Sequence, residues 1–412
     1  MRPSNGRPWS LVAMLCATAT AGYICRVNVS TAAPLLMEEF GLSQIEMGRI
    51  FSAFLLGYAL FQIPSGALAD HYGARRILSL IAWFWFIITV LQTIVGWGPF
   101  HSTAAAALVG FMVFRFILGI TASPTYPGSA QGVSGWVLPQ FQGRANGIVI
   151  ASIGLGSALA PPLVSNVMVS FGWRPALIAS AVPAIIIALI WLKVKEPQHI
   201  NYPSSVRNET KSNNISGSRG KINSLSFWLL TLSYTLQGYV GYIFVTWFYL
   251  YLVQERHFGL LGGAWMSSIP WILSIVSIPL GGLISDRLAA GRLGPVWGRR
   301  TVPLAGMAFS GILISIGAHT ESAVMAAISL AFATALILCV EGPFWAMMMR
   351  IAGNKSGTAG GIMNMGSNLG GLISPALTPV IASMIGWENA LHVAAALAVT
   401  GALLWLWIKP EN

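Results

Sequence analysis

Two stretches of the sequence decide its architecture. Gly66-Ala-Leu-Ala-Asp70-His-Tyr-Gly73-Ala-Arg75-Arg76 joins two long apolar segments, and Gly282-Leu-Ile-Ser-Asp286-Arg287 with the later Gly298-Arg299-Arg300 repeats its glycine, aspartate and arginine pair. The two aspartates are 216 positions apart. A second repeat relates Gly143–Pro161 to Gly357–Pro375 at an offset of 214. Two independent repeats at nearly the same offset predict a chain made of two parallel halves.

The composition places both halves in a membrane. Of the 412 residues, 55% are hydrophobic and 8% are charged, and the mean hydropathy is +0.70. A soluble domain carries about 25% charged residues, so an ordinary globular enzyme is excluded. Apolar segments of roughly 20 residues, the length of a membrane-spanning helix, recur along the chain. The predicted fold is an all-α polytopic membrane protein with twelve transmembrane helices in two six-helix halves, at 10–36, 46–68, 77–97, 103–127, 143–169, 173–193, 225–253, 260–284, 301–319, 322–347, 357–384 and 387–408.

The segment 194–224 separates the two halves. It is rich in Ser and Asn and nearly free of large apolar side chains, which is typical of a flexible linker. The predicted domains are therefore an N-terminal half at 1–193, a cytoplasmic linker at 194–224 and a C-terminal half at 225–412.

The basic residues lie mainly on one side of the predicted membrane. Of the 23 Lys and Arg residues, 18 fall in the loops of one side and three, Arg49, Arg174 and Arg256, in those of the other. The positive-inside rule places both termini in the cytoplasm, and we expect an integral protein of a bacterial inner membrane. The same bias accounts for the net charge of +11, so we expect the lipid bilayer and no nucleic acid as a partner.

The two remaining arginines, Arg26 and Arg115, lie at membrane depth. A cation there costs about 2.5–3.5 kcal/mol on insertion scales, so it is a functional-site hypothesis by default. A guanidinium binds a carboxylate through two parallel hydrogen bonds, which favours anion recognition. Arg26 is the first candidate and Arg115 the second. The alternatives are that Arg26 snorkels outward or braces helix carbonyls, and that Arg115 is held by Glu341 or by backbone carbonyls.

Other polar side chains in the predicted helices are candidates for the same site. Hydroxyl and amide groups that face hydrocarbon are unfavourable, so they should face a partner helix or a cavity. Helix packing explains any one of them as well as ligand contact does. The candidate substrate-binding residues besides the two arginines are Tyr23, Tyr58, Gln62, Gln237, Tyr242, Asn364 and Asn368.

The Gly66–Arg76 stretch resembles the loop signature of the major facilitator superfamily. A narrower resemblance, to the anion:cation symporter family, follows from Arg26-Val-Asn28, Gly57-Tyr58-Ala-Leu-Phe-Gln62-Ile-Pro64, Thr246-Trp247-Phe248 and Gly342-Pro-Phe-Trp345, with Asn364–Gly371 in addition. That family includes sugar-acid transporters of bacteria and the sialin and vesicular glutamate transporters of animals. The resemblance implies organic anions as substrates, commonly driven by protons.

The chain departs from this family at two positions. Proton-coupled members carry an aspartate just before the helix-1 arginine and a glutamate in helix 4, where this chain has Cys25 and Ser123. Glu341 is the acidic residue that falls at membrane depth, so it is the coupling candidate. The alternatives are a structural role for Glu341 beside a cation, and coupling by Na⁺, by exchange, or no coupling.

The predicted function is secondary active transport of a small organic anion, a sugar acid or similar monocarboxylate, by alternating access. The alternative is a membrane sensor that kept the fold and lost coupled transport. The sequence contains no nucleophile–base pair, metal cluster or phosphate-binding loop, so we expect no enzyme activity, no cofactor and no metal. We expect a monomer whose partners are the substrate anion and H⁺ or Na⁺. The predicted gating charges are Asp70, Arg75, Arg76, Asp286, Arg299 and Arg300.

Overall fold

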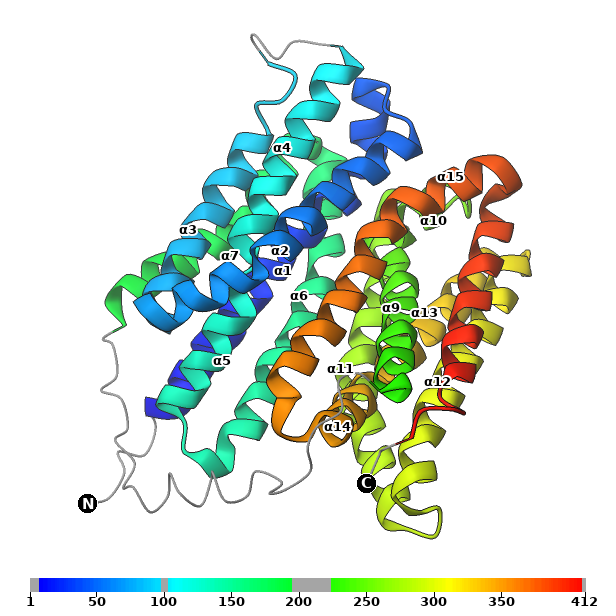
Figure 1. Ribbon diagram of the computed structural model, residues 1–412. Helices are drawn as coiled ribbons and strands as arrows, with labels where there is room; N and C mark the ends of the chain where they lie inside the picture. The colour runs from blue at the N-terminus through cyan, green and yellow to red at the C-terminus, as the bar shows by residue number, and fades with distance from the viewer. Residues whose placement is uncertain (1–6, 98–102, 195–223, 410–412) are drawn as a thin grey trace. The chain divides into compact units, whose positions relative to one another are not determined.

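The computed structural model describes residues 7–97, 103–194 and 224–409, and in these ranges it is helical and contains no β-strand. Figure 1 shows the helices as long rods. The elements are α1 (Arg7–Phe40), α2 (Gln44–Tyr72), α3 (Ala74–Gln92), α4 (Ala104–Ala122), α5 (Thr125–Trp136), α6 (Pro139–Phe171), α7 (Trp173–Lys193), α9 (Leu225–Thr246), α10 (Phe248–Gln254), α11 (Leu260–Ala290), α12 (Gly294–His319), α13 (Ala323–Cys339), α14 (Glu341–Ala352), the 3₁₀ turn η2 (Gly353–Lys355) and α15 (Ser356–Leu404).

The described helices give the predicted number of membrane spans. Ten helical segments are long and apolar enough to cross a bilayer, and the pair α9–α10, bent by 51°, makes an eleventh. The helix α15, counted once among the ten, consists of two helices that meet at Gly386. Dividing it there gives twelve spans, so the predicted all-α fold with twelve transmembrane helices is confirmed.

Glycines at equivalent positions end helices in both repeats. Gly172 separates α6 from α7 with a φ of 82°, and Gly386 divides α15 with a φ of 84°. Positive φ is open to glycine because it has no Cβ. The two glycines are 214 positions apart and each precedes a tryptophan, which is the spacing of the repeat seen in the sequence.

The described chain separates into two compact units. Unit 1 takes in the described residues of Met1–Ile200, Val245–Ile275 and Pro375–Leu377, and unit 2 those of Asn201–Phe244, Val276–Ser374 and Thr378–Asn412. This partition gives residues 245–275 to unit 1, whereas the sequence assigns them to the C-terminal half. The predicted domain boundaries stay a prediction, and most of the 194–224 linker lies outside the described residues.

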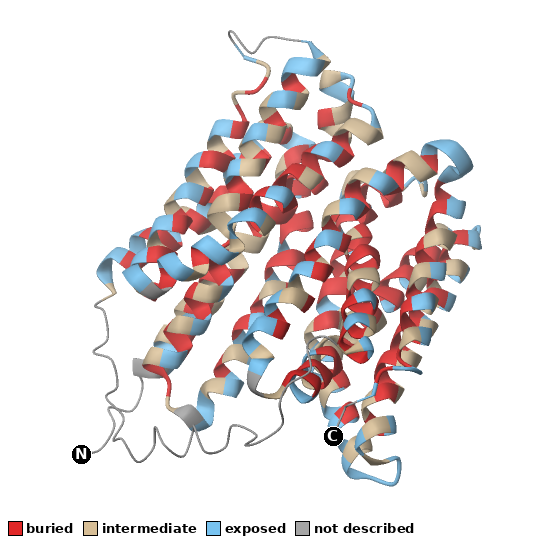
Figure 2. Ribbon diagram, in the orientation of Figure 1, coloured by how far each residue is buried: buried red, intermediate tan, exposed pale blue. Residues whose placement is uncertain are grey.

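Large apolar side chains lie on the surfaces of both units. Leu60 and Ile63 of α2 are 59% and 83% exposed, and Val276 of α11 and Phe309 of α12 are 66% and 58% exposed. Figure 2 shows exposed positions in pale blue along the helices of each unit, beside buried positions in red. A helix that is apolar on nearly every side is typical of a membrane span, whose outer face contacts lipid.

A close crossing of α2 and α4 in unit 1 depends on two glycines. A Cβ on Gly57 would clash with the carbonyl oxygen of Phe116, and a Cβ on Gly119 would clash with that of Phe54. Small residues allow helix backbones to approach closely in membranes. This crossing fixes α2 beside α4, and the two helices carry Tyr58 and Arg115.

One end of α1 is held by Arg174 at the start of α7. Its guanidinium lies 2.7 Å from a carboxylate oxygen of Glu39 on α1 and donates to the carbonyls of Thr93 and Val95, beyond α3. The indole N–H of Trp173 donates to the same carboxylate at 2.6 Å. These contacts join α1, α3 and α7, and so fix the helix that carries Arg26.

Replacing Gly119 with alanine should destabilise the protein. The added methyl group has to displace the α2 backbone, and overpacking of this kind costs about 1–3 kcal/mol. We expect a lower melting temperature in detergent, measured by intrinsic fluorescence during heating. Gly147→Ala is the matched control, because a Cβ at this helical glycine meets no heavy atom within 4 Å. Equal melting temperatures for the two variants would contradict the tight crossing.

Candidate functional site

The guanidinium of Arg26 lies among aromatic side chains in unit 1. Arg26 is 9% exposed, and its Nη1 donates a hydrogen bond of 3.2 Å to the hydroxyl of Tyr23, one turn earlier on α1. Its Cζ lies 5.0 Å from the ring centroids of Tyr23 and Phe54 and 5.3 Å from that of Tyr58. Cation–π contacts of this kind contribute about 0.5–2 kcal/mol each, more when they are shielded from water. The aromatic rings thus stabilise a buried cation.

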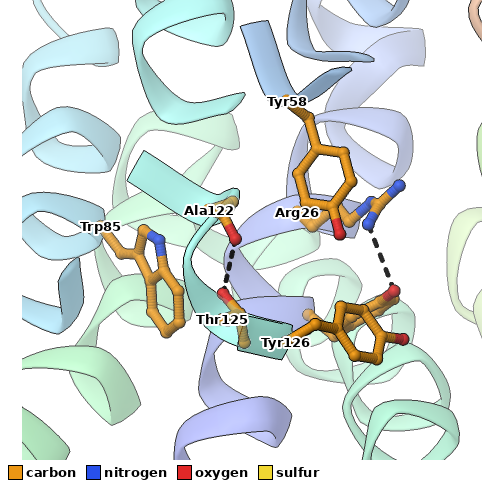
Figure 3. Close-up of a pocket in the computed structure, with 8 residues that line it drawn as sticks. Arg26, Tyr58, Trp85, Ala122, Thr125 and Tyr126 are labelled. Atoms are coloured by element: carbon orange, nitrogen blue, oxygen red, sulfur yellow. Dashed lines mark hydrogen bonds between the residues drawn. The ribbon is translucent and has the colours of Figure 1, made fainter. Parts of the chain in front are cut away.

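Arg26, Tyr23 and Tyr58 line a pocket to which five helices contribute. Figure 3 shows Tyr58 and Tyr126 beside Arg26, with Trp85 and Thr125 further along the wall. The hydroxyl of Thr125 donates to the carbonyl of Ala122 at 2.6 Å, across the break between α4 and α5. The pocket is lined by Gly22, Tyr23, Arg26, Tyr58, Trp85, Ala122, Thr125 and Tyr126.

The pocket therefore combines predicted residues with residues that the sequence did not single out. Tyr23, Arg26 and Tyr58 were predicted as substrate-binding residues, and the structure brings them together. Trp85 and Tyr126 were missed, because an aromatic side chain in an apolar helix resembles an ordinary core residue. The Ser123-Pro124 helix break was the available signal, since residues next to a break in a membrane helix line cavities.

Arg115 has a different environment from Arg26. It is 3% exposed, and it donates to the backbone carbonyls of Cys25 at 3.4 Å and of Arg26 at 2.8 Å. Its Cζ also lies 4.9 Å from the Phe54 ring, which therefore contacts both arginines. Arg115 is not among the pocket-lining residues. Of the alternatives raised by the sequence, the structure contains the contact with backbone carbonyls.

The side chains at positions 25 and 123 face helix interfaces. The Cys25 sulfur lies 3.8 Å from the carbonyl oxygen of Ser180 on α7, and Cys25 is 1% exposed. The Ser123 hydroxyl donates to the carbonyls of Ile120 and, at 3.3 Å, of Phe61 on α2. Ser123 is not a lining residue of the pocket, whereas its neighbour Ala122 is.

The other predicted substrate contacts lie apart from this pocket. Gln62 is half-buried on α2 and is not a lining residue. In unit 2, Tyr242 of α9 packs against Gly371 of α15. On the same face of α15, Asn364 is half-buried and Asn368 is 8% exposed. Their roles in binding stay predictions.

Glu341 begins α14 in unit 2 and contacts α9. Its carboxylate accepts hydrogen bonds from the hydroxyl of Tyr234 at 2.7 Å and from Nε2 of Gln237 at 3.2 Å. The same Nε2 donates to the carbonyl of Ile337 at 3.1 Å. Gln237, which the sequence predicts as a substrate contact, is 2% exposed and donates a hydrogen bond to Glu341.

The predicted gating charges have varied surroundings. Asp286 and Arg299 form an ion pair of 3.0 Å in unit 2. Arg300 is 3% exposed and donates to the carbonyl of Ile408 at 2.7 Å. Arg75 donates to the carbonyl of Leu192 at 3.3 Å, Arg76 is exposed, and the side chain of Asp70 lies outside the described residues.

Comparison with known families identifies the class of protein. A sequence model of the Major Facilitator Superfamily matches residues 12–374 and, in a second match, residues 288–412. The chain belongs to the Major Facilitator Superfamily, as its loop signature predicted. Among the described residues, no group of three or more His, Cys, Asp or Glu side chains could hold a metal ion.

Several transporters resemble the chain over nearly their whole length. It is 28% identical to the probable sulfoacetate transporter SauU of Cupriavidus necator, over 97% of this chain and 93% of that protein. It is 28% identical to the hexuronate transporter of Bacillus subtilis, over 92% and 90%. It is 26% identical to the D-galactonate transporter of Escherichia coli, over 98% and 96%.

Solved structures support the fold. A bacterial homologue of the human lysosomal transporter Spinster, inward-facing and unoccupied, superposes with a TM-score of 0.82 at 18% identity, over 98% of both chains. A D-xylose-proton symporter gives a TM-score of 0.77 at 17% identity, also over 98% of both chains.

A carboxylate introduced at position 122 should interfere with anion binding, because Ala122 and Arg26 line the same pocket. We expect Ala122→Glu to raise the apparent KM for a transported anion at least about tenfold, since a 1.4 kcal/mol electrostatic penalty gives that factor. Ala122→Gln, of nearly the same size and neutral, should raise it less. Radiolabelled uptake into proteoliposomes measures both.

The neighbouring position 123 provides a control, because the side chain of Ser123 faces α2 and does not line the pocket. Ser123 is fully buried against α2, so Ser123→Glu would bury a charge in a helix interface and should reduce the yield of folded protein on size-exclusion chromatography. If Ser123→Glu were well folded and had a raised KM while Ala122→Glu kept the wild-type KM, then Ser123, and not Ala122, would face the pocket.

Proposed function

We propose that the chain is a secondary active transporter of a small organic anion, of the sugar-acid or similar monocarboxylate class. The observation that carries this proposal is the guanidinium of Arg26, buried in the membrane-depth pocket of unit 1. The relatives are named for sulfoacetate, hexuronate and D-galactonate. These compounds share a small polar body with a carboxylate or sulfonate, and such a group matches a guanidinium.

Arg26 would bind the charged end of the substrate. A guanidinium can form two parallel hydrogen bonds with a carboxylate, and charge-assisted bonds of this kind are roughly twice as strong as neutral ones. The Tyr23, Phe54 and Tyr58 rings hold the guanidinium in place, so less side-chain entropy is lost on binding. Phenol hydroxyls such as those of Tyr23, Tyr58 and Tyr126 can both donate and accept, which would suit them to sugar hydroxyl groups.

Arg115 would act as a positioning residue. Its bonds to the carbonyls of Cys25 and Arg26 hold the α1 backbone at the residue that carries the anion-binding side chain. Its positive charge, close to the same aromatic ring as Arg26, would also favour an anion in the pocket.

Polar and charged residues outside the pocket would provide further substrate contacts and the charge contacts of the transport cycle. We propose Gln62, Tyr242, Asn364 and Asn368 as further substrate contacts, because polar side chains at membrane depth tend to face a cavity or a partner helix. Asp70, Arg75 and Arg76 in the first repeat, and Asp286, Arg299 and Arg300 in the second, would favour one access state through charge contacts such as the Asp286–Arg299 pair.

We also propose an orientation and a location for the protein in the membrane. The excess of basic residues in one set of loops favours cytoplasmic termini, and the bacterial relatives favour an inner membrane. The two repeats would work as N-terminal and C-terminal halves that move against each other in a monomer, joined by the 194–224 linker.

Conservative replacement of Arg26 should impair transport. Arg26→Lys keeps the charge and loses the two-pronged hydrogen-bonding geometry, and hydrogen bonds to charged groups contribute about 1.5–3 kcal/mol. We expect the apparent affinity to fall about 10- to 100-fold, and more in Arg26→Ala. The measurement is uptake of sulfoacetate, D-galactonate, D-glucarate and D-glucuronate into proteoliposomes.

Arg49→Lys is the matched control, since Arg49 is an exposed arginine at the start of α2 and should tolerate the same change. If Arg26→Lys and Arg26→Ala transported every panel anion as well as the wild type does, Arg26 would not be the anion-binding residue. If the wild type transported none of these anions, the proposed substrate class would be wrong.

A further inference from the structure

Two helices are interrupted at equivalent points of the two repeats. α4 ends at Ala122 and α5 begins at Thr125, whereas α13 ends at Cys339 and α14 begins at Glu341. The ends Ala122 and Cys339 are 217 positions apart, close to the 216 that separate Asp70 and Asp286. The two breaks are therefore counterparts, and they differ in chemistry because the second one carries a carboxylate.

The break in unit 1 contains no acidic side chain. Ala122, Thr125 and Tyr126 line the pocket there, beside the cation Arg26. The neighbouring Cys25 and Ser123 are neutral and face helix interfaces. A proton-binding carboxylate is thus missing at the positions where the family resemblance leads one to expect it.

The break in unit 2 surrounds Glu341 with hydrogen-bond donors. The hydroxyl of Tyr234 and the amide of Gln237 each donate to one of its two oxygens. Tyr234 is 4% and Gln237 2% exposed. Within the described part of the chain, no Lys, Arg or His lies within ion-pair distance of Glu341.

The orientation of the Gln237 amide follows from a second contact. Its Nε2 lies 3.1 Å from the carbonyl oxygen of Ile337, which can only accept a hydrogen bond. The nitrogen must therefore face Ile337 and Glu341 together, which directs an N–H, and not the amide oxygen, toward the carboxylate. Glu341 consequently faces hydrogens, whereas a hard cation such as Na⁺ needs several oxygen ligands.

The same arrangement suits a carboxyl group that gains and loses one proton. The ionised carboxylate accepts from Tyr234 and Gln237. After protonation, the new O–H can donate to the Tyr234 oxygen, because a phenol is both donor and acceptor, while Gln237 continues to donate to the other oxygen. Neither state leaves the carboxyl group without a partner, and no fixed cation holds it in the ionised form.

We propose that Glu341 is the proton-binding site of the transport cycle, with Tyr234 and Gln237 as its positioning residues. This inference rests on the proposed function. A proton from water forms an O–H bond on the carboxylate on one side of the membrane, and the bond breaks to release the proton to water on the other side. One proton carried with one monovalent anion is electroneutral.

Several other titratable groups of unit 2 have hydrogen-bond or ion-pair partners of their own. Asp286 pairs with Arg299, Arg300 bonds to Ile408, His319 bonds to Glu388, and Tyr239 bonds to Thr378. The titratable side chains on the elements around the break, apart from Tyr234, are Tyr239 and Tyr242 of α9, Asp286 and Arg287 of α11, Arg299, Arg300 and His319 of α12, Cys339 of α13, Arg350 of α14 and Glu388 and His392 of α15.

Two assays on proteoliposomes that contain the full chain test the inference. Counterflow exchange of a labelled panel anion needs no net proton movement, whereas accumulation against its gradient does. With an imposed difference of one pH unit, wild type should accumulate the anion up to about tenfold, and a pH-sensitive dye in the lumen should report acidification when the anion is added. Glu341→Gln should still exchange, with a concentration ratio near one and no acidification.

Tyr234→Phe and Tyr239→Phe form a matched pair on α9. The first removes a donor to Glu341 and should shift the pH profile of uptake, and the second removes the bond to Thr378 and should not. Proton-driven accumulation by Glu341→Gln at the wild-type level would overturn the inference, as would a wild type that exchanges the anion but neither accumulates it under the pH difference nor acidifies the lumen. Absence of exchange by the wild type for every panel anion would instead contradict the proposed function.

Discussion

The guanidinium of Arg26 has to be accommodated at membrane depth, and much of unit 1 is arranged around that requirement. Three aromatic rings from α1 and α2 surround the cation. Arg115 holds the backbone of the same residue by its carbonyl, while Arg174 fixes the end of α1 against α3 and α7. Each contact restricts where the Arg26 side chain can lie. In the proposed function, a cation positioned in this way would already have the geometry for binding an anion, which would lower the entropy lost on binding.

The two repeats share their helix breaks and have opposite charges beside them. In unit 1 the break between α4 and α5 lies at a pocket that contains Arg26, and in unit 2 the equivalent break carries Glu341. Duplication supplies two similar breaks, and helix breaks are where membrane proteins place polar backbone and side chains for ions and substrates. In the roles proposed above, the break in unit 1 would serve anion binding and the break in unit 2 would serve proton binding.

The number of spans and the place of Arg26 within an apolar helix follow from the sequence, because hydropathy and a lone cation in an apolar segment are local signals. The hydrogen-bond partners of Arg115 do not follow from the sequence, because its bonds to the carbonyls of Cys25 and Arg26 depend on how α1 packs against α4. The sequence also does not predict that Ala122 lines the pocket while Ser123 faces α2, because this depends on how α4 is turned at the break. Trp85 and Tyr126 were hidden among the chain's many aromatic residues, where composition does not separate pocket from core.

The central claim, that Arg26 holds the charged group of the substrate, is tested most directly by a distance. Solid-state NMR can measure dipolar coupling between the carboxylate carbon of ¹³C-labelled D-galactonate and ¹⁵N-labelled arginine side chains of the protein in lipid. The account predicts a coupling typical of a direct guanidinium–carboxylate contact, which disappears in Arg26→Lys under conditions where the anion remains bound. A coupling that persists unchanged in Arg26→Lys, or bound substrate with no arginine coupling in the wild type, would contradict it.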